Sequence, residues 1–173
     1  MEKLGITHIV FDVDGTLTDG SITISSNGVE SKDFQAKDGI IVRELPKLGF
    51  TTMFLTGRDS ELTNIRAKDL KISEVVQGVL NKEEILRGYM AKHHLSGKQL
   101  AYIGDDVNDY VAMSLCAFKA CPADAVSEIK SICDYVSSFN GGDGAVRDIC
   151  EHLLHCLGKY KEFLDLFGIR KGR

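Results

Sequence analysis

The sequence predicts an α/β protein with a Rossmann-like, doubly wound parallel sheet. Short apolar runs rich in β-branched and aromatic residues, typical of buried parallel strands, alternate with segments of helical periodicity. Polar motifs follow several of these runs, where the strands would end and where open α/β sheets bind ligands. A chain of 173 residues is expected to form one domain around such a sheet.

The expected elements follow one another in a regular order. Strands are expected at residues 9–11, 52–55, 75–76, 100–103 and 117–118. Helices are expected at residues 39–48, 60–70, 82–94, 108–115, 125–132 and 145–157. Each of the first four helices would then serve as the crossover between two parallel strands.

One segment, residues 21–34, interrupts this alternation. Its polarity alternates on both sides of Asn27-Gly28, a pair that favours the tight turn of a β-hairpin. The hairpin, at about residues 20–35, would come directly after the first strand. Its alternatives are a surface decoration and an active-site flap, and its place beside the strand ends favours the flap.

Composition and cysteine usage exclude several classes of protein. Asp and Glu outnumber Lys and Arg by 25 to 21, a net charge of −4 that disfavours nucleic-acid and anionic membrane partners. No apolar run approaches the ~18 residues of a membrane span, and the N-terminus lacks the apolar stretch of a signal peptide. The five cysteines have no zinc-site spacing, so we expect reduced core thiols in a cytoplasmic protein, with a zinc site at Cys116 and Cys121 as the alternative.

Two aspartates directly follow the first expected strand. Asp12 and Asp14 are two residues apart, so an extended backbone projects both carboxylates to the same side. Crowded carboxylates raise each other's pKa, and a bound divalent cation such as Mg²⁺ removes that penalty. Asp105, which follows another strand, would complete the cluster. Taken alone, Asp-x-Asp-Gly is also the pattern of a capped turn.

Three further motifs occur at expected strand ends or helix starts. They are Thr56-Gly57-Arg58, Lys82, and Gly104-Asp105-Asp106-Val107-Asn108-Asp109. Each has a structural alternative: Thr56 could cap a helix, and Lys82 could be a solvated charge. All the motifs lie where ligands bind in a doubly wound sheet, and this favours an active site.

Taken together, the motifs resemble those of the haloacid dehalogenase-like phosphohydrolases. The resemblance implies that Asp12 is the nucleophile and Asp14 the general acid/base. Thr56 and Lys82 would hold the transferring phosphoryl group. These roles agree with the charge neutralisation and in-line attack that phosphoryl transfer requires.

The same resemblance implies a Mg²⁺ site. Asp12, Asp105 and the backbone carbonyl of Asp14 would be its ligands. Asp109 and Asp106 would act around it, as partners of Lys82 or of metal-bound water.

The chain has no room for a separate cap domain. Only about twenty residues separate Thr18 from Asp38, and about twenty-five separate Thr56 from Lys82. Further matching segments are residues 12–20, Lys37-Asp38-Gly39, residues 55–58, Gln77-Gly78, residues 101–106 and residues 141–147. With them the sequence resembles a capless subgroup, the 3-deoxy-D-manno-octulosonate (KDO) 8-phosphate phosphatases of lipopolysaccharide biosynthesis and their nonulosonate 9-phosphate relatives. The resemblance implies a homotetramer whose hairpins meet at the centre and whose subunits shape one another's active sites.

Substrate binding is expected at Thr56, Gly57, Arg58 and Lys82. The planar guanidinium of Arg58 can hold a sugar acid's carboxylate, which favours KDO 8-phosphate as substrate. A nonulosonate or sialic acid 9-phosphate phosphatase is the first alternative. A non-catalytic tetramerisation domain related to acylneuraminate cytidylyltransferases is the second.

We expect a phosphatase domain at residues 1–158 and a C-terminal extension at residues 159–173. The extension ends in a basic tail. The tail would either be solvated or, as the subgroup implies, enter a neighbouring subunit's active site.

Overall fold

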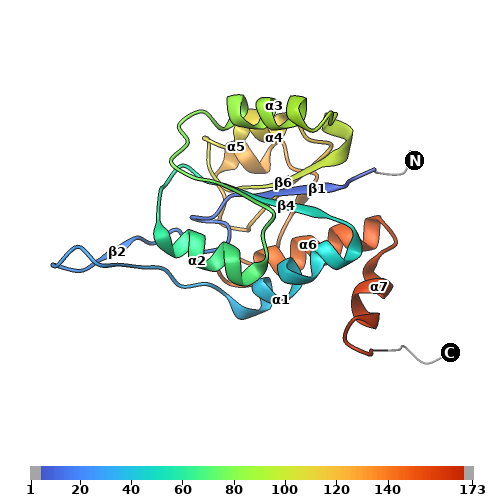
Figure 1. Ribbon diagram of the computed structural model, residues 1–173, viewed down its shortest axis with the longest axis horizontal. Coiled ribbons are helices and arrows are strands. Elements are labelled where there is room, and N and C mark those ends of the chain that lie inside the picture. Colours follow the sequence, from blue (N-terminus) through green and yellow to red (C-terminus); the bar gives the residue numbers. More distant parts are fainter. Residues whose placement is uncertain (1–4, 170–173) are drawn as a thin grey trace.

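The computed structural model, which describes residues 5–169, has three layers (Figure 1). The central sheet has six strands in the order β5-β4-β1-β6-β7-β8, and all neighbouring strands are parallel. The strands are β1 (His8–Phe11), β4 (Thr51–Leu55), β5 (Glu74–Val76), β6 (Leu100–Ile103), β7 (Phe118–Cys121) and β8 (Tyr135–Val136). The predicted doubly wound parallel sheet is therefore confirmed.

Helices cover both faces of the sheet. They are α1 (Ala36–Glu44), α2 (Glu61–Leu70), α3 (Lys82–Lys92), α4 (Tyr110–Ser114), α5 (Ser127–Lys130), α6 (Ala145–Cys156) and α7 (Tyr160–Asp165), with 3₁₀ turns η1 (Leu45–Leu48) and η2 (Gly97–Gln99). Helices α3, α4 and α5 lie on one face, and α1, α2 and α6 lie on the other (Figure 1). Among residues 5–169, no helix is long and apolar enough to cross a bilayer.

Alternating side chains of β1 supply both cores. Ile9 and Phe11 belong to the core that includes α1 and α6, whereas Val10 belongs to the core that includes α3 and α4. This alternation is the period of two that a strand imposes on its side chains. Because both faces are covered, β1, β4 and β6 are buried along most of their length, and the site residues follow shortly after them.

Several element boundaries differ from the sequence prediction. The helix expected at 39–48 begins earlier, at Ala36, and changes to the 3₁₀ turn η1 at Leu45, because Pro46 has no N–H for a helical hydrogen bond. The helices expected at 108–115 and 125–132 are shorter, and the strand expected at 117–118 extends to Cys121. Strand β8 was not predicted.

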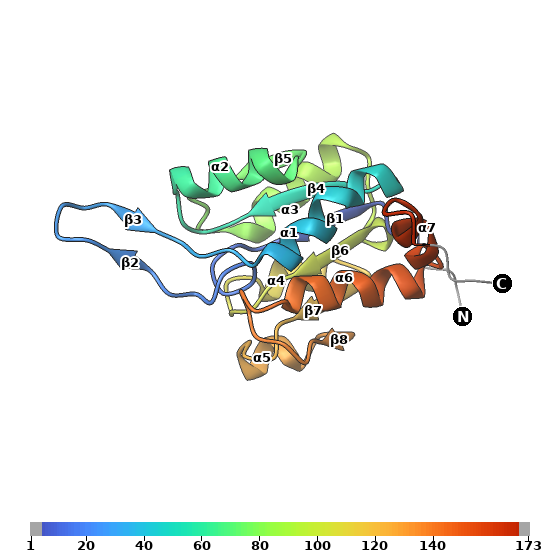
Figure 2. The same cartoon turned by 90° about the horizontal axis from the view of Figure 1, so that it is seen from below.

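The predicted hairpin is present and projects from the body of the molecule (Figure 2). Its strands β2 (Thr23–Ile24) and β3 (Glu30–Ser31) are antiparallel. Gly28 has φ of 81° and donates its N–H to the Ser25 carbonyl at 2.9 Å, the tight turn that Asn27-Gly28 predicted.

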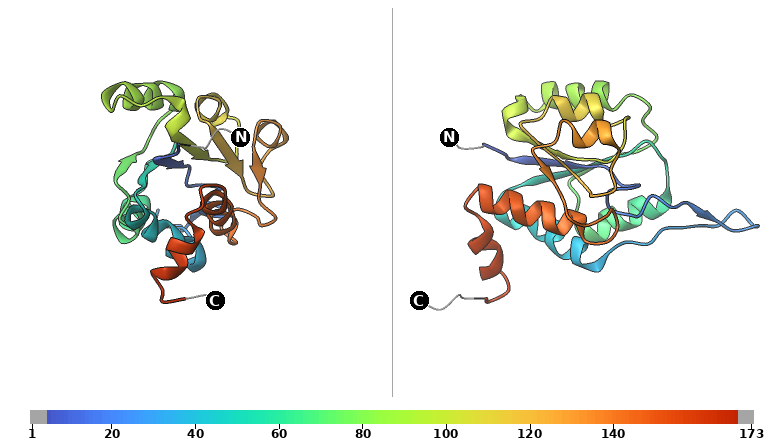
Figure 3. Two further views of the ribbon diagram at one scale, coloured as in Figure 1. Left: turned by 90° about the vertical axis from the view of Figure 1, so that its right-hand side faces the viewer. Right: turned by 180° about the vertical axis from the view of Figure 1, so that it is seen from behind.

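The C-terminal helix α7 lies at the end of the molecule opposite the hairpin (Figure 3). Its residue Phe163 is buried in the core that includes α1 and α6. The described part of the expected extension, residues 159–169, is thus packed onto the body of the protein through α7. Residues 170–173 of the predicted basic tail lie outside the described residues.

Candidate active site

The carboxyl ends of the central strands meet at a cleft of about 430 Å³. Asp12 follows β1, Thr56 follows β4, and Asp105 follows β6 after Gly104. Lys82 is the first residue of α3. The cleft is lined by Asp12, Asp14, Ile22, Thr56, Gly57, Arg58 and Asn108. The sequence motifs therefore converge on one end of the sheet, as predicted.

At the cleft, Lys82 forms a buried ion-pair network. Its ammonium donates to Asp12 Oδ1 at 2.6 Å and to Asp109 Oδ1 at 2.7 Å. The side chain of Lys82 is 0% exposed, and those of Asp12 and Asp109 are 6% and 0% exposed. The hydroxyl of Tyr102 also donates to Asp109 Oδ1, at 2.7 Å. Asp109 thus bonds to the same ammonium as Asp12.

The pKa values reflect burial and crowding of the carboxylates. Burial and the nearby Asp109 raise the pKa of Asp12 well above its usual value, and burial with Asp109 raises the pKa of Asp105 to about 6. Burial alone would lower the pKa of Lys82, but the charges of Asp12 and Asp109 outweigh it and raise that pKa. One ammonium does not offset three carboxylates, so the cluster favours a further cation.

The donor set fits a hard divalent cation. One oxygen each of Asp12, Asp105 and Asp109 lies within 4.8 Å of the others. Asp109 is already occupied, because Oδ1 accepts from Lys82 and Tyr102 and Oδ2 accepts from the Asp105 N–H at 3.2 Å. Asp12 and Asp105 remain the carboxylates that could hold the ion.

Small residues let the backbone approach this cluster. Gly15 has φ of 94°, and a Cβ there would lie 2.1 Å from Asp105 Oδ2, so only glycine fits without a shift. The next residue, Thr16, donates its hydroxyl to Asp105 Oδ1 at 3.0 Å and fixes that carboxylate.

Asp14 lies at the cleft but outside the Lys82 network. Its side chain is 18% exposed, and its Oδ1 accepts a hydrogen bond from Lys32 Nζ at 2.6 Å. Its Oδ2 is buried and has no hydrogen-bond partner among residues 5–169. Asp14 therefore lies at the same cleft as Asp12, but it pairs with Lys32 and not with Lys82.

The base of the hairpin forms part of the cleft. Ile22 lines the cleft, and Glu30 of β3 accepts from Arg58 Nε at 2.7 Å and from Ser60 Oγ at 2.8 Å. The hydrogen bond from Ser60 and the Arg58 guanidinium lower the pKa of Glu30. These contacts give the hairpin the position expected of a flap beside the site.

Some site residues were misjudged from the sequence. Asp106 is exposed, and its Oδ1 accepts from the Val107 N–H at 2.7 Å, so the structure does not bring Asp106 into the cluster. Lys32, Glu30 and Tyr102 were missed. Lys32 and Glu30 bond to partners 18 and 28 residues away, and nothing in the local sequence signals those contacts.

The expectation that all five cysteines are core thiols is wrong. Cys116, Cys121 and Cys150 are buried, but Cys133 is half-buried and Cys156 is exposed at the end of α6. In residues 5–169, the only group of three or more His, Cys, Asp or Glu side chains placed to bind a metal is the aspartate cluster. The zinc alternative therefore finds no support in the described residues.

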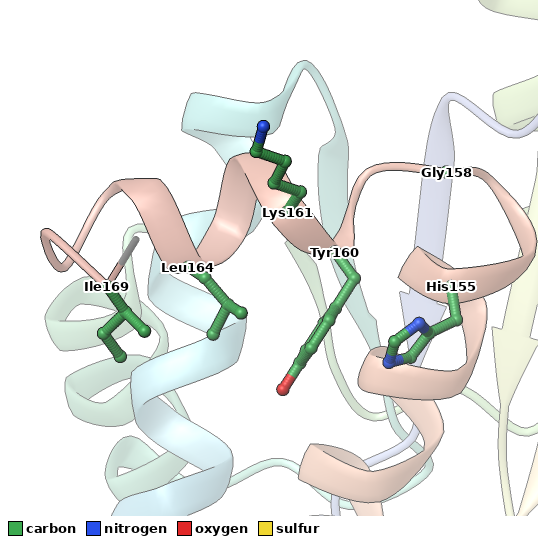
Figure 4. A pocket seen from close by; sticks show the side chains of 6 residues that line it. All are labelled: His155, Gly158, Tyr160, Lys161, Leu164 and Ile169. Carbon is green, nitrogen blue, oxygen red and sulfur yellow. The ribbon is translucent and has the colours of Figure 1, made fainter. Parts of the chain in front are cut away.

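A second cavity, of about 320 Å³, lies beside α6 and α7 (Figure 4). It is lined by His155, Gly158, Tyr160, Lys161, Leu164 and Ile169. The Tyr160 ring lies between His155 and Leu164 in Figure 4, and its centroid is 4.0 Å from that of His155. No member of the aspartate cluster lines this cavity, so the chemistry is assigned to the cleft.

Known proteins with similar sequences share nearly the whole chain. The KDO 8-phosphate phosphatase KdsC of Haemophilus influenzae is 35% identical over 166 residues, 96% of this chain and 92% of that protein. The KdsC of Escherichia coli K12 is 34% identical over 157 residues, 91% of this chain and 84% of that protein.

Solved structures agree with these sequence matches. The KDO 8-phosphate phosphatase of Moraxella catarrhalis, crystallised with magnesium, phosphate and KDO, has a TM-score of 0.91 and 34% identity and covers 95% of each chain. The cobalt-bound enzyme of H. influenzae has a TM-score of 0.87 and 34% identity, covering 94% of this chain and 95% of that chain.

A family model also matches the segment that carries most of the cleft. Residues 55–149 match the model of haloacid dehalogenase-like hydrolases, and they include Thr56, Lys82, Asp105 and Asp109. The matched segment, the full-length relatives and the cleft geometry agree: the chain belongs to the haloacid dehalogenase-like hydrolase family.

Proposed function

We propose that this protein is a Mg²⁺-dependent phosphatase that hydrolyses KDO 8-phosphate through an aspartyl-phosphate. The observation that carries the proposal is the placement of Asp12 at an open cleft, 2.6 Å from the buried ammonium of Lys82 and beside Asp105. The relatives that share 34–35% of its residues over most of the chain are KDO 8-phosphate phosphatases, which supports that substrate.

In the first step, a carboxylate oxygen of Asp12 forms a bond to phosphorus while the bond from phosphorus to the sugar oxygen breaks. Asp14 gives its proton to the departing oxygen. In the second step, water attacks phosphorus, the bond to Asp12 breaks, and a water proton returns to Asp14. Inorganic phosphate leaves and both aspartates are restored.

The cations of the site would neutralise the negative charge of the phosphoryl group. Lys82 places a fixed positive charge at Asp12, and the Thr56 hydroxyl can donate to a phosphoryl oxygen. Asp12, Asp105 and the backbone carbonyl of Asp14 would hold Mg²⁺. When bound, Mg²⁺ supplies charge neutralisation that lets an anionic nucleophile approach an anionic phosphate.

Arg58 is the proposed contact for the sugar acid's carboxylate. It lines the cleft, and Glu30 accepts from its Nε, which leaves the other guanidinium nitrogens for a ligand. Gly57 lies at the same wall and admits close approach of the substrate. Nonulosonate and sialic acid 9-phosphates also carry a carboxylate, and they are the competing substrates.

The working form is proposed to be a cytoplasmic homotetramer assembled through the hairpins. Ile24 and Val29 of the hairpin are 61% and 60% exposed, and a projecting two-stranded edge is an aggregation hazard unless another chain covers it. The five cysteines are all free thiols, which supports a reducing compartment.

A substrate panel tests the proposed function. Purified protein is assayed with Mg²⁺ against KDO 8-phosphate and the nonulosonate and sialic acid 9-phosphates, with Asp12→Asn beside it. Asp165→Asn, at the exposed end of α7, is the matched control. We expect kcat/KM to be highest for KDO 8-phosphate, to vanish in Asp12→Asn and to be unchanged in the control. Equal low activity on every phosphate, or full activity in Asp12→Asn, would contradict the proposal.

A further inference from the structure

Glu30 of the hairpin uses both of its carboxylate oxygens at the wall of the cleft. Oε1 accepts from Arg58 Nε at 2.7 Å, and Oε2 accepts from Ser60 Oγ at 2.8 Å. The side chain of Glu30 is 19% exposed, and that of Arg58 is 37% exposed. A simple surface ion pair leaves both side chains free to move, but a carboxylate held at both oxygens has a fixed plane. Glu30 therefore offers Arg58 an acceptor in one defined position.

Ser60 has a different partner from the one that its place in the chain favours. It is the N-cap residue of α2, where a serine hydroxyl ordinarily accepts a backbone N–H of the first helical turn. Within the described residues no such hydrogen bond forms, and the hydroxyl donates to Glu30 instead. Departures from a usual local role are expected at functional sites, so this one points to a use for the contact with Glu30.

The support of Glu30 is itself anchored. The Ser60 N–H donates to Gln77 Oε1 at 3.0 Å, and Gln77 Nε2 donates to Asn64 Oδ1 of α2 at 2.7 Å. These hydrogen bonds connect the start of α2 to the segment that follows β5. Arg58 is thus the last member of a chain of contacts that begins in the body of the protein, as a well-supported binding residue requires.

Glu30 covers only one part of the Arg58 guanidinium. Nε is occupied, and neither Nη nitrogen donates a hydrogen bond to any of residues 5–169. Arg58 lines the cleft and Glu30 does not, so a ligand in the cleft would meet the part of the guanidinium that Glu30 leaves uncovered. The two Nη nitrogens can bind a carboxylate as a pair. Because the side chain is already held, the ligand would not bear the cost of ordering it.

We propose that Glu30 is a positioning residue for substrate specificity, which holds Arg58 at Nε so that the Nη nitrogens bind the carboxylate of the sugar acid. The proposal rests on the proposed function, because it takes Arg58 as the contact for that carboxylate. Two interpretations compete with it. In one, the Glu30 carboxylate competes with the substrate for Arg58. In the other, the ion pair only attaches the hairpin.

Two substitutions of Glu30 separate these interpretations. In Glu30→Ala we expect KM for KDO 8-phosphate to rise about 3- to 10-fold and kcat to change less than about 2-fold, because the substrate must now order Arg58. KM for p-nitrophenyl phosphate, which has no carboxylate, should change less than about 2-fold, since its binding needs no order in Arg58. Glu30→Gln keeps an acceptor for Arg58 and a group that can bond to the Ser60 hydroxyl, so KM for KDO 8-phosphate should stay within about 2-fold of wild type.

A double substitution tests whether the effect passes through Arg58. In an Arg58→Met background, Glu30→Ala should change KM for KDO 8-phosphate less than about 1.5-fold, because the side chain that Glu30 positions is absent. Glu162→Ala is the matched control. Glu162 also forms an ion pair, with Lys159 at 3.5 Å, and it lies on α7 at the end of the molecule opposite the hairpin (Figure 3). Its loss should leave KM for both substrates unchanged.

Circular dichroism and sedimentation equilibrium check that each variant keeps its fold and its mass. Where Glu30→Ala changes either, Ser60→Ala replaces it. This variant removes one of the two contacts of Glu30, so KM for KDO 8-phosphate should rise in the same direction by a smaller factor.

The outcomes distinguish this proposal from the function on which it rests. A fall in KM for KDO 8-phosphate in both Glu30→Ala and Glu30→Gln shows competition and overturns the role of Glu30. An equal change of KM for both substrates, or no change, overturns it as well. No difference between the two substrates in Arg58→Met overturns the Arg58 contact and this proposal with it. Full activity in Asp12→Asn overturns the proposed function itself.

Discussion

Lys82 is a buried cation whose position depends on its neighbours. Its ammonium bonds to Asp12 and Asp109, and Tyr102 bonds to the same oxygen of Asp109. Burial and the nearby Asp109 raise the pKa of Tyr102 well above its usual value, so the hydroxyl keeps its proton and stays a donor. Tyr102 therefore supports the site through Asp109 without reaching the cleft.

Tyr102→Phe tests this support. We expect the variant to lose about 1 kcal/mol of unfolding free energy, because Asp109 loses one hydrogen bond and keeps the one from Lys82. Urea unfolding measures the loss. Tyr110→Phe is the control, since Tyr110 is 39% exposed, and it should change stability by less than about 0.5 kcal/mol. Equal effects of the two substitutions would show that the Tyr102 hydroxyl contributes nothing.

Arg58→Met tests recognition of the sugar acid. Loss of a charged hydrogen bond to the substrate carboxylate should raise KM for KDO 8-phosphate about 10-fold or more. KM for p-nitrophenyl phosphate, which has no carboxylate, should stay the same. Steady-state kinetics on both substrates measures the difference, with Arg87→Met on the exposed side of α3 as control. A similar rise for both substrates would place Arg58 at the phosphoryl group instead.

Sequence and structure differ in how much of the site each reveals. One feature could be predicted from short motifs at strand ends, without knowledge of packing: the meeting of Asp12, Asp14, Thr56, Lys82 and Asp105 at one end of the sheet. The contact of Lys32 could not be predicted, because Lys32 is buried only when the hairpin packs against the loop after β1. Asp106 was misplaced because a motif cannot tell which of two adjacent aspartates points inward.

At the scale of elements, Asp38 joins two helices. It lies on α1, and its buried carboxylate accepts the backbone N–H of Arg147 at 2.7 Å in the first turn of α6. The N-cap of α6, Gly144, has no side chain to do this. Burial raises the pKa of Asp38 from 3.8 to about 6, although backbone hydrogen bonds from Arg147 and Gly144 act to lower it.

The pH dependence of the free energy of unfolding, compared between wild type and Asp38→Asn, tests this cap. A folded-state pKa above the unfolded value means that the folded state binds the proton more tightly, so wild-type stability falls as pH rises from about 4 to about 6. The shift corresponds to a loss of about 2–3 kcal/mol at neutral pH relative to pH 4. Asparagine does not titrate, so the variant should gain stability relative to wild type over that range. A stability difference that stays constant from pH 4 to pH 7 would contradict the raised pKa.

The central strands could be predicted because each contains a run of apolar residues bounded by polar segments. Strands β1, β4 and β6 are buried on both faces, so their apolar runs are continuous. Strand β8 has only two residues, too few for a period, and it forms because β7 offers an edge to pair with. Packing of α7 through Phe163 likewise depends on a core that only the folded chain creates.

At the scale of the whole molecule, the hairpin projects at one end and α7 lies at the other (Figure 3). The cleft is on the hairpin side, because Ile22 at the base of the hairpin lines it. An open cleft without a cap admits water and substrate alike. If hairpins of neighbouring subunits meet, they would narrow this opening and cover the apolar side chains that the single chain exposes.

Ile24→Ser combined with Val29→Ser tests the assembly. Both side chains are mostly exposed on the hairpin, so the substitutions should leave the fold of one chain intact and remove apolar area from the contact between chains. We expect the tetramer to dissociate in sedimentation equilibrium. Ile65→Ser, 58% exposed on α2, is the control and should leave the mass unchanged. A wild-type monomer, or a tetramer that survives the double substitution, would contradict the hairpin assembly.

The proposed reaction depends most on Asp12 as the residue that accepts the phosphoryl group. The direct measurement is acid quenching of the enzyme during turnover of KDO 8-phosphate with Mg²⁺, followed by mass spectrometry of the peptide that contains Asp12. We predict a phosphoryl group on Asp12 in the wild-type protein, sensitive to hydroxylamine as an acyl phosphate is, and none after chelation of the metal or in Asp12→Asn. Turnover with no phosphorylated Asp12 at any quench time, or a phosphoryl group on another residue, would contradict the account.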